Sequence, residues 1–189
     1  MAKWTFEPGH TAAEFSVRHM MVTHVRGHFK DIHGTMEFEP DNPTAASLEA
    51  RIEVAKLWTG ERDRDAHLKS ADFLDAQNHG QIAFRSTKVR QLGCNHFRLI
   101  GELTIRGVSR DVSLDVEYLG QWETPFWVGD RNYGPVTRAG FAATTVINRH
   151  DFGVSWNAVL DRGGIVVADD VFITIDVEAI RNKEGVSLP

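Results

Sequence analysis

Several features that mark common protein classes are missing from this chain. Cys94 is the single cysteine among 189 residues, which excludes an internal disulfide and every CxxC metal or redox pattern. No run of eighteen apolar residues occurs, so we expect no integral membrane segment. The net charge is −5 without a block of like charges, and we therefore expect no nucleic-acid partner. The strings GxSxG, GxGxxG, GxxxxGK(S/T) and HExxH are also absent, so no common catalytic motif identifies an enzyme.

The N-terminus shows no apolar leader, because Met1 to Trp4 leads directly into patterned sequence. We therefore expect a cytoplasmic protein as the sequence is written, or a periplasmic one if a signal peptide preceding this segment was removed. A length of 189 residues favours a single domain, residues 1–189, long enough to close a barrel around an interior space.

Alternation of apolar and polar residues with period two dominates the chain. In residues 47–54, Leu48, Ala50 and Ile52 alternate with charged residues, as expected of a half-buried strand. The same pattern recurs, strongly or weakly, in residues 15–17, 25–38, 82–89, 97–105, 112–118, 139–147 and 171–177. Turn-forming residues separate these segments at 41–43, 92–95, 106–109 and 162–164. About eight antiparallel strands with one apolar face predict a sandwich or a closed barrel.

A charged, helix-prone segment, residues 59–75, lies between two of the predicted strands. Thr59 is the predicted N-cap, and Glu61 is favoured near the first turn by the helix dipole. We expect the helix to pack on the barrel through its apolar residues Leu68, Phe73 and Leu74.

Residues 120–136 interrupt the alternation with glycine, proline and aromatic residues. We predict that this segment is a long loop rather than a simple hairpin turn. Long structured loops of this kind often act as lids or binding loops.

Eight different short motifs follow one another along residues 4–181. They are PGHTAAEFSVRH (8–19), VRGHF (25–29), GTMEF (34–38), TGERDRDAHLKSADFLD (59–75), IAFRS (82–86), GELTIRGVS (101–109), RAGF (138–141) and NRHDFG (148–153). In this order and spacing they resemble the YceI-like family of lipocalin-like, polyisoprenoid-binding proteins. The chain departs from the family at Thr11, where serine is usual, at Gly80, near which a proline is common, and in its tryptophan-rich residues 120–136. The resemblance implies an all-β fold: an eight-stranded antiparallel lipocalin-like barrel with a short helical insert.

The resemblance and the strand parity together predict an apolar lumen. Each CH₂ group of a ligand buried there would contribute about 0.8 kcal/mol, so ten carbons give about 8 kcal/mol before association costs. The predicted ligand-binding residues are Phe15, Val17, Phe29, Phe38, Phe84, Phe97, Leu99, Leu103 and Phe141. Small residues on the same face either leave lumen volume or mark tight strand packing, and a solid core stays the alternative. These small residues are Ala50, Gly101, Ala139 and Ala143.

Five histidines lie between positions 10 and 33. Strand parity places His24 and His28 on one face and His33 on the other, and no cysteine or HExxH partner supports them, so we predict no metal site. The family pattern has histidine at His10 and His19, and we expect these two residues to contact a ligand head group or to fix strand ends.

Adjacent opposite charges occur at Arg62-Asp63, Arg64-Asp65 and Arg149/Asp151. Such pairs anchor structure more often than they catalyse, so we predict that they tether the insert and the loops to the barrel. No catalytic residue is predicted.

The sequence therefore predicts a binding protein rather than an enzyme. By the resemblance, it sequesters or carries a polyisoprenoid or a similar long-chain lipid, of the quinone or prenyl phosphate type, with the tail in the lumen. No cofactor is required, although a bound polyisoprenoid or isoprenoid quinone is compatible with the lumen, and a homodimer stays open. Two alternatives also stay open. One is a barrel enzyme that acts on an isoprenoid or lipid through His10, His19 or Arg149/Asp151, and the other is a histidine-dependent metal or haem protein.

Overall fold

The computed structural model describes residues 1–160 and 164–182, and strands make up most of them. The strands are β1 (Ala2–Phe6), β2 (Ala12–His19), β3 (Thr23–Phe29), β4 (His33–Phe38), β5 (Ser47–Glu53), β6 (Gln81–Gln91), β7 (His96–Ile105), β8 (Val108–Val128), β9 (Arg131–Asn148) and β10 (Val167–Arg181). The helices in these ranges are α1 (Arg62–Lys69) and the 3₁₀ turns η1 (Pro8–His10), η2 (Pro43–Ala45), η3 (Val54–Lys56) and η4 (Arg149–Phe152). The predicted turn at 162–164 lies partly outside the described residues.

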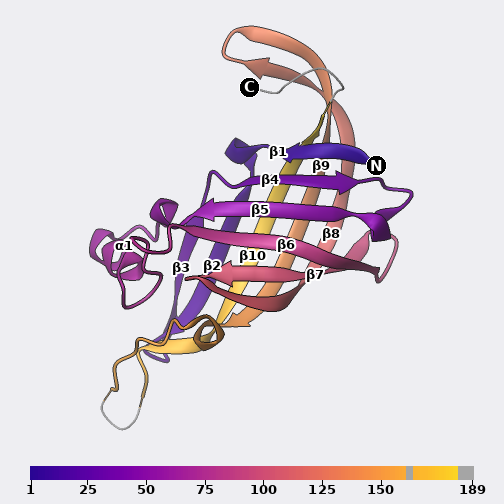
Figure 1. Ribbon diagram of the computed structural model, residues 1–189. Coiled ribbons are helices and arrows are strands. Elements are labelled where there is room, and N and C mark those ends of the chain that lie inside the picture. The colour runs from indigo at the N-terminus through magenta and orange to yellow at the C-terminus, as the bar shows by residue number, and fades with distance from the viewer. Residues whose placement is uncertain (161–163, 183–189) are drawn as a thin grey trace.

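The strands close into an eight-stranded antiparallel barrel, which confirms the predicted fold class (Figure 1). We call each position around the barrel wall a stave. Ten strands give eight staves, because two of the staves are each made of two strands. β10 pairs with β2 along its first part and with β1 near its end, so β1 and β2 share one stave across η1. β3 pairs with β2 and β4 pairs with β1, so these two strands share the next stave. The β1–β10 ladder closes the ring, and closure removes the exposed edges that an open sheet of this length would carry.

Strand β1 was not predicted from the sequence. Its inward residues Trp4 and Phe6 are nonetheless among the most buried in the protein. They pack in the cluster that fills one end of the barrel, together with Ile32, Met36, Phe38 and Ala179. A segment of five residues between the N-terminus and a proline gives too few alternations to identify a strand.

The prediction of a long loop at residues 120–136 is wrong. β8 and β9 continue through this segment as a paired hairpin, with Val128 opposite Arg131 at its tip. The hairpin extends beyond the barrel, at the top of Figure 1. Register shifts at Tyr118/Gly120 and Pro125/Trp127 break the period-two pattern, and this is why the alternation disappears from the sequence although the ladder persists.

The extended hairpin is anchored on the outside of the barrel. Phe126 and Val136 bury Ile180 of β10, whereas the preceding residue, Ala179, packs in the interior of the barrel. Arg138 pairs with Glu178, and its guanidinium also lies over the ring of Phe126. An apolar cluster and the Arg138–Glu178 ion pair therefore tie the base of the hairpin to β10.

Candidate functional site: an apolar cavity in the barrel

The barrel encloses a cavity of about 320 Å³ with an almost entirely apolar wall. Its lining runs from Val89 and Phe97 near one end of the barrel to Phe73 and Phe152 near the other. Pockets that bind small molecules usually measure about 300–1,000 Å³, so the free space is sufficient for part of a ligand. The alternative of a solid core is therefore wrong.

All nine residues predicted to face the lumen line this cavity: Phe15, Val17, Phe29, Phe38, Phe84, Phe97, Leu99, Leu103 and Phe141. They come from six different strands, and period-two alternation places each of them on the inner face. Some of them touch one another, since the rings of Phe38 and Phe141 meet edge to face with centroids 5.2 Å apart. That they bind a ligand stays a prediction.

The small residues on the inner face have two different roles. Ala50 and Ala143 line the cavity, so they contribute free volume. Gly101 does not line it, because the ring of Phe84 covers the glycine and a Cβ there would meet that ring at 2.5 Å and the carbonyl of Arg85 at 2.4 Å. Ala139 is also tightly packed, at 1% exposure. For Gly101 and Ala139 the tight-packing alternative is therefore the correct one.

The helical insert forms part of the cavity wall. Leu68, Phe73 and Leu74 line the cavity and pack against residues of the barrel, as the sequence predicted. Glu61, rather than Thr59, is the N-cap of α1, and its carboxylate accepts hydrogen bonds from the backbone N–H groups of Asp63 and Arg64. These two bonds lower the pKa of Glu61 below its usual value.

The tether between insert and barrel is not the predicted one. The carboxylate of Asp65 accepts bonds from the backbone and hydroxyl of Thr59, and Arg64 donates back to Thr59, so both side chains stabilise the insert internally. The connection to the barrel comes from Arg106 in the β7–β8 turn. Its guanidinium donates to the carbonyl of Ala71 in the insert and to that of Gly153 after η4.

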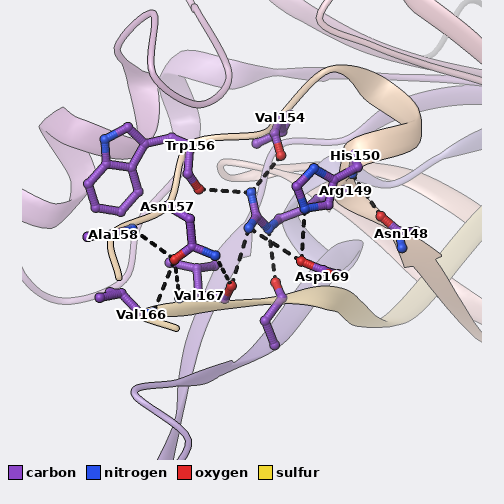
Figure 2. Close-up of polar contacts among 11 residues, drawn as sticks. Asn148, Arg149, His150, Val154, Trp156, Asn157, Ala158, Val166, Val167 and Asp169 are labelled. Atoms are coloured by element: carbon purple, nitrogen blue, oxygen red, sulfur yellow. Dashed lines mark hydrogen bonds and ion pairs between the residues drawn. The ribbon is translucent and has the colours of Figure 1, made fainter. Parts of the chain in front are cut away.

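A buried arginine, Arg149, is part of the cavity lining at the end of the barrel where η4 follows β9, and Figure 2 shows its polar contacts. Arg149 is 5% exposed, and each of its three guanidinium nitrogens donates at least one hydrogen bond to the protein itself. Nη1 donates to Val154 (2.7 Å) and Trp156 (2.9 Å), Nε to Ala168 (2.9 Å), and Nη2 to Val167 (3.2 Å), all at backbone carbonyls. Nη2 also lies 3.6 Å from Asp169, which in turn contacts His150.

These contacts make Arg149 an anchor for residues 154 and 156 on one side and residues 167 and 168 on the other. Burial lowers the pKa of Arg149, and the carboxylate of Asp169 opposes that effect. Asn157 adds to the same network, because its side-chain oxygen accepts from the backbone N–H groups of Ala158, Val166 and Val167. The prediction that Arg149 anchors a loop is confirmed, although its carboxylate partner is Asp169 and not Asp151.

The two histidines predicted at a head group or a strand end lie outside the cavity lining. His10, in η1, is exposed on the outer surface and contacts Glu178 at 3.2 Å. His19 ends β2 and pairs with Val167 of β10. A head group would have to leave the cavity to meet either residue, so the strand-end role is the one that the geometry supports. Arg149 is buried and Asp151 exposed, and His10 lies on a different element, so these residues do not form one site.

The other clustered histidines are also separated. His28 packs its ring on Trp58, with centroids 4.7 Å apart, whereas His33 contacts Asp31 at 3.2 Å. Within residues 1–160 and 164–182, no three His, Cys, Asp or Glu side chains gather as a metal site would require. In the same ranges every buried side-chain nitrogen or oxygen has a hydrogen-bond partner.

Sequence reasoning missed part of the cavity wall. β10 contributes an inner row whose alternation was recognised but not assigned to the site, and β1 contributes Phe6. The missed residues of β10 are Val171, Ile173, Ile175 and Val177. Their period-two signal was sufficient to identify them.

These features define a class: a closed antiparallel lipocalin-like barrel with an apolar interior. The YceI-like domain family matches residues 4–179, and the chain belongs to that family. It is 35% identical over 181 residues to the UPF0312 protein ECA1782 of Pectobacterium atrosepticum, an alignment that covers 96% of this chain and 86% of the relative.

Solved structures show the same fold. The YceI protein of Campylobacter jejuni matches with a TM-score of 0.69 and 28% identity, over 88% of this chain and 90% of that one. A polyisoprenoid binding domain from Saccharophagus degradans matches with a TM-score of 0.66 and 11% identity, over 96% of this chain and all of that one (100%). At that identity the second likeness concerns the fold alone. Among the described residues, no helix is both long and apolar enough to cross a membrane.

Proposed function

We propose that this protein binds a polyisoprenoid or a similar long-chain lipid, with the tail in the barrel cavity and without chemical change to the ligand. The observation that carries the proposal is the unfilled apolar space of about 320 Å³ inside a closed barrel. The structural neighbour from Saccharophagus degradans, described as polyisoprenoid binding, adds support for this ligand class.

The physical reason is that an empty apolar cavity forfeits dispersion contacts which a hydrocarbon chain restores. Aromatic and branched side chains line the wall on all sides, and polar atoms are nearly absent from it. A water molecule needs two to four polar partners, so an apolar chain is the better occupant of this space. The quinone or prenyl phosphate head group then belongs outside the lining, because the wall is almost entirely apolar and each guanidinium nitrogen of Arg149 is already hydrogen-bonded within the protein.

Filling the cavity tests the proposal. Ala143 lines the cavity and the next residue, Thr144, is exposed on the outer face of β9. We expect Ala143→Trp to abolish uptake of a long polyprenol such as solanesol, and Thr144→Trp to leave uptake unchanged. Overpacking costs about 1–3 kcal/mol, so circular dichroism must show that the Ala143 variant stays folded. Equal uptake by both variants would overturn the proposal.

The ligand itself is identified by mass spectrometry of an organic extract from protein purified without detergent. We expect a long-chain isoprenoid, recovered at the same mass after prolonged incubation with the protein. A shorter or altered product would instead favour the enzymatic alternative. We also propose that no metal is required, so EDTA treatment should leave both the fold and solanesol uptake intact. Stoichiometric zinc or a haem absorbance band in untreated protein would contradict this.

A further inference from the structure

An apolar tip protrudes at the Arg149 end of the barrel. The turn between β2 and β3 presents Met20, Met21 and Val22, and Val22 is 84% exposed. The segment after η4 lies beside it, since the backbone N–H of Met20 donates to the carbonyl of Val166 (2.8 Å). That segment adds exposed Val159 and Ile165, which form a bridge with each other. Figure 1 shows the two segments together at the lower left of the barrel.

The backbone of this turn is unusual for the residues that occupy it. Met20 (φ 48°) and Met21 (φ 61°) both adopt the left-handed conformation, and the N–H of Val22 donates to the carbonyl of His19. Turns with two such residues favour asparagine and glycine, because other side chains meet a steric cost there. The cost is not offset by burial, since Met21 is 53% exposed. A strained position that exposes methionine points to a contact made outside the chain.

The charge around the tip indicates the partner. Residues 15–30 contain no aspartate or glutamate, although the whole chain has a net charge of −5. Arg18, His19 and His24 lie next to the turn and Arg26 follows along β3, whereas His28 and Lys30 lie at the far end of that strand. Of the two carboxylates at the start of the neighbouring strand β10, Asp169 contacts Arg149 and His150, and Asp170 is exposed. Apolar side chains that protrude from a basic hairpin match the chemistry of an anionic lipid surface.

We propose that this tip, Met20–Val22 with Val159 and Ile165, inserts into the surface of an anionic lipid bilayer. The contact goes beyond the proposed ligand binding, because it rests on the outer surface and not on the cavity. It would orient the barrel with its Arg149 end toward the membrane. The cavity-lining residues Val17 and Val167 lie in the strand ends that lead to the tip, so docking brings this end of the cavity close to the bilayer.

Vesicle flotation tests the proposal with the full chain. We expect the protein to float with phosphatidylcholine vesicles that contain roughly one third phosphatidylglycerol, and less with phosphatidylcholine alone. Added salt should weaken the binding, because it screens the exposed charges. Arg26→Gln should weaken it by about fivefold, the effect of one basic residue near an anionic surface.

The decisive variant is Met20→Asn with Met21→Gly. These residues suit the left-handed turn, so the fold should be at least as stable as that of the parent while flotation is lost. Trp122→Ser and Leu92→Ser remove exposed apolar side chains elsewhere and should float like the parent. Unchanged flotation of the double variant, or no flotation of the parent, would overturn the proposal. Sedimentation velocity tests whether the tip is instead an interface between copies of the chain. If the parent is a dimer and the double variant a monomer with intact vesicle binding, the tip is such an interface and the proposal is overturned.

Solanesol uptake from a detergent dispersion separates this proposal from the proposed function. We expect the tip variant to retain uptake. If the parent protein floats with vesicles but takes up no solanesol, the proposed ligand binding is contradicted and the proposed membrane contact is not.

Discussion

The cavity wall and the Arg149 cluster lie next to each other but differ in how completely their side chains are in contact with other groups. The wall presents apolar side chains to unfilled space, so its contacts are incomplete. In the cluster each guanidinium nitrogen of Arg149 is hydrogen-bonded, since four backbone carbonyls accept from it and the carboxylate of Asp169 lies 3.6 Å from Nη2. The difference separates function from architecture, because incomplete apolar contacts leave room for a ligand whereas a fully paired cation holds the chain together.

The largest effect is expected where the polar contacts are complete. Replacing Arg149 with alanine removes the guanidinium donors from the carbonyls of residues 154, 156 and 168, whereas the carbonyl of Val167 keeps its hydrogen bond from the side chain of Asn157. Breaking a buried charged network by removal of one partner costs about 3–5 kcal/mol, so Arg149→Ala should lower the free energy of unfolding by that amount. Urea denaturation measures it. A loss of less than about 1 kcal/mol would show that the cluster is not the anchor, and would weaken the comparison.

A smaller loss of stability is expected for changes inside the insert. The expected loss differs between two neighbouring acidic residues, Asp65 and Asp63. Asp65 accepts two hydrogen bonds from Thr59, whereas no side-chain contact connects Asp63 to the barrel among the described residues. Asp65→Ala should therefore cost about 1–2 kcal/mol. Asp63→Ala should cost about 0.5 kcal/mol or less, the effect of a charge near the helix N-terminus. Thermal melts of both variants decide this, and equal melting temperatures would contradict the internal role of Asp65.

The smallest effect concerns the cap of α1 and depends on pH. The pKa of Glu61 is lowered in the folded protein, so its carboxylate stabilises the fold above the unfolded pKa, which is near 4.5. That contribution is lost as the pH falls through the lowered folded value. Glu61→Gln should therefore melt below the parent at pH 7, and the two should converge in acid. A difference in melting temperature that stays constant down to acid pH would show that the charge of Glu61 is not responsible.

The two regions were not equally predictable from sequence. All nine predicted lumen residues reach the cavity wall, because period-two alternation fixes the face of each strand whatever its partner is. The network at the Arg149 end was not predictable in detail, since four of the partners of Arg149 are backbone carbonyls that carry no residue identity. The prediction of how the insert is tethered to the barrel was wrong for the same reason. Arg106 binds the carbonyls of Ala71 and Gly153, whereas the charge pattern had pointed to Arg62, Asp63 and Asp65.

The amino-acid sequence by itself determined the strand-rich fold, the inward face of each regular strand and the presence of a helical insert, because these follow from local periodicity and from short-range motifs. Tertiary structure alone decided three other features. It joined β1 and β2 into one stave, because β10 pairs with both. It extended β8 and β9 through a segment whose glycines and prolines suggest a loop, because each strand supplies the other with a ladder partner. It also decided the volume of the cavity, because free volume depends on how side chains from distant strands meet, as where the ring of Phe84 packs over Gly101 and the rings of Phe38 and Phe141 meet edge to face.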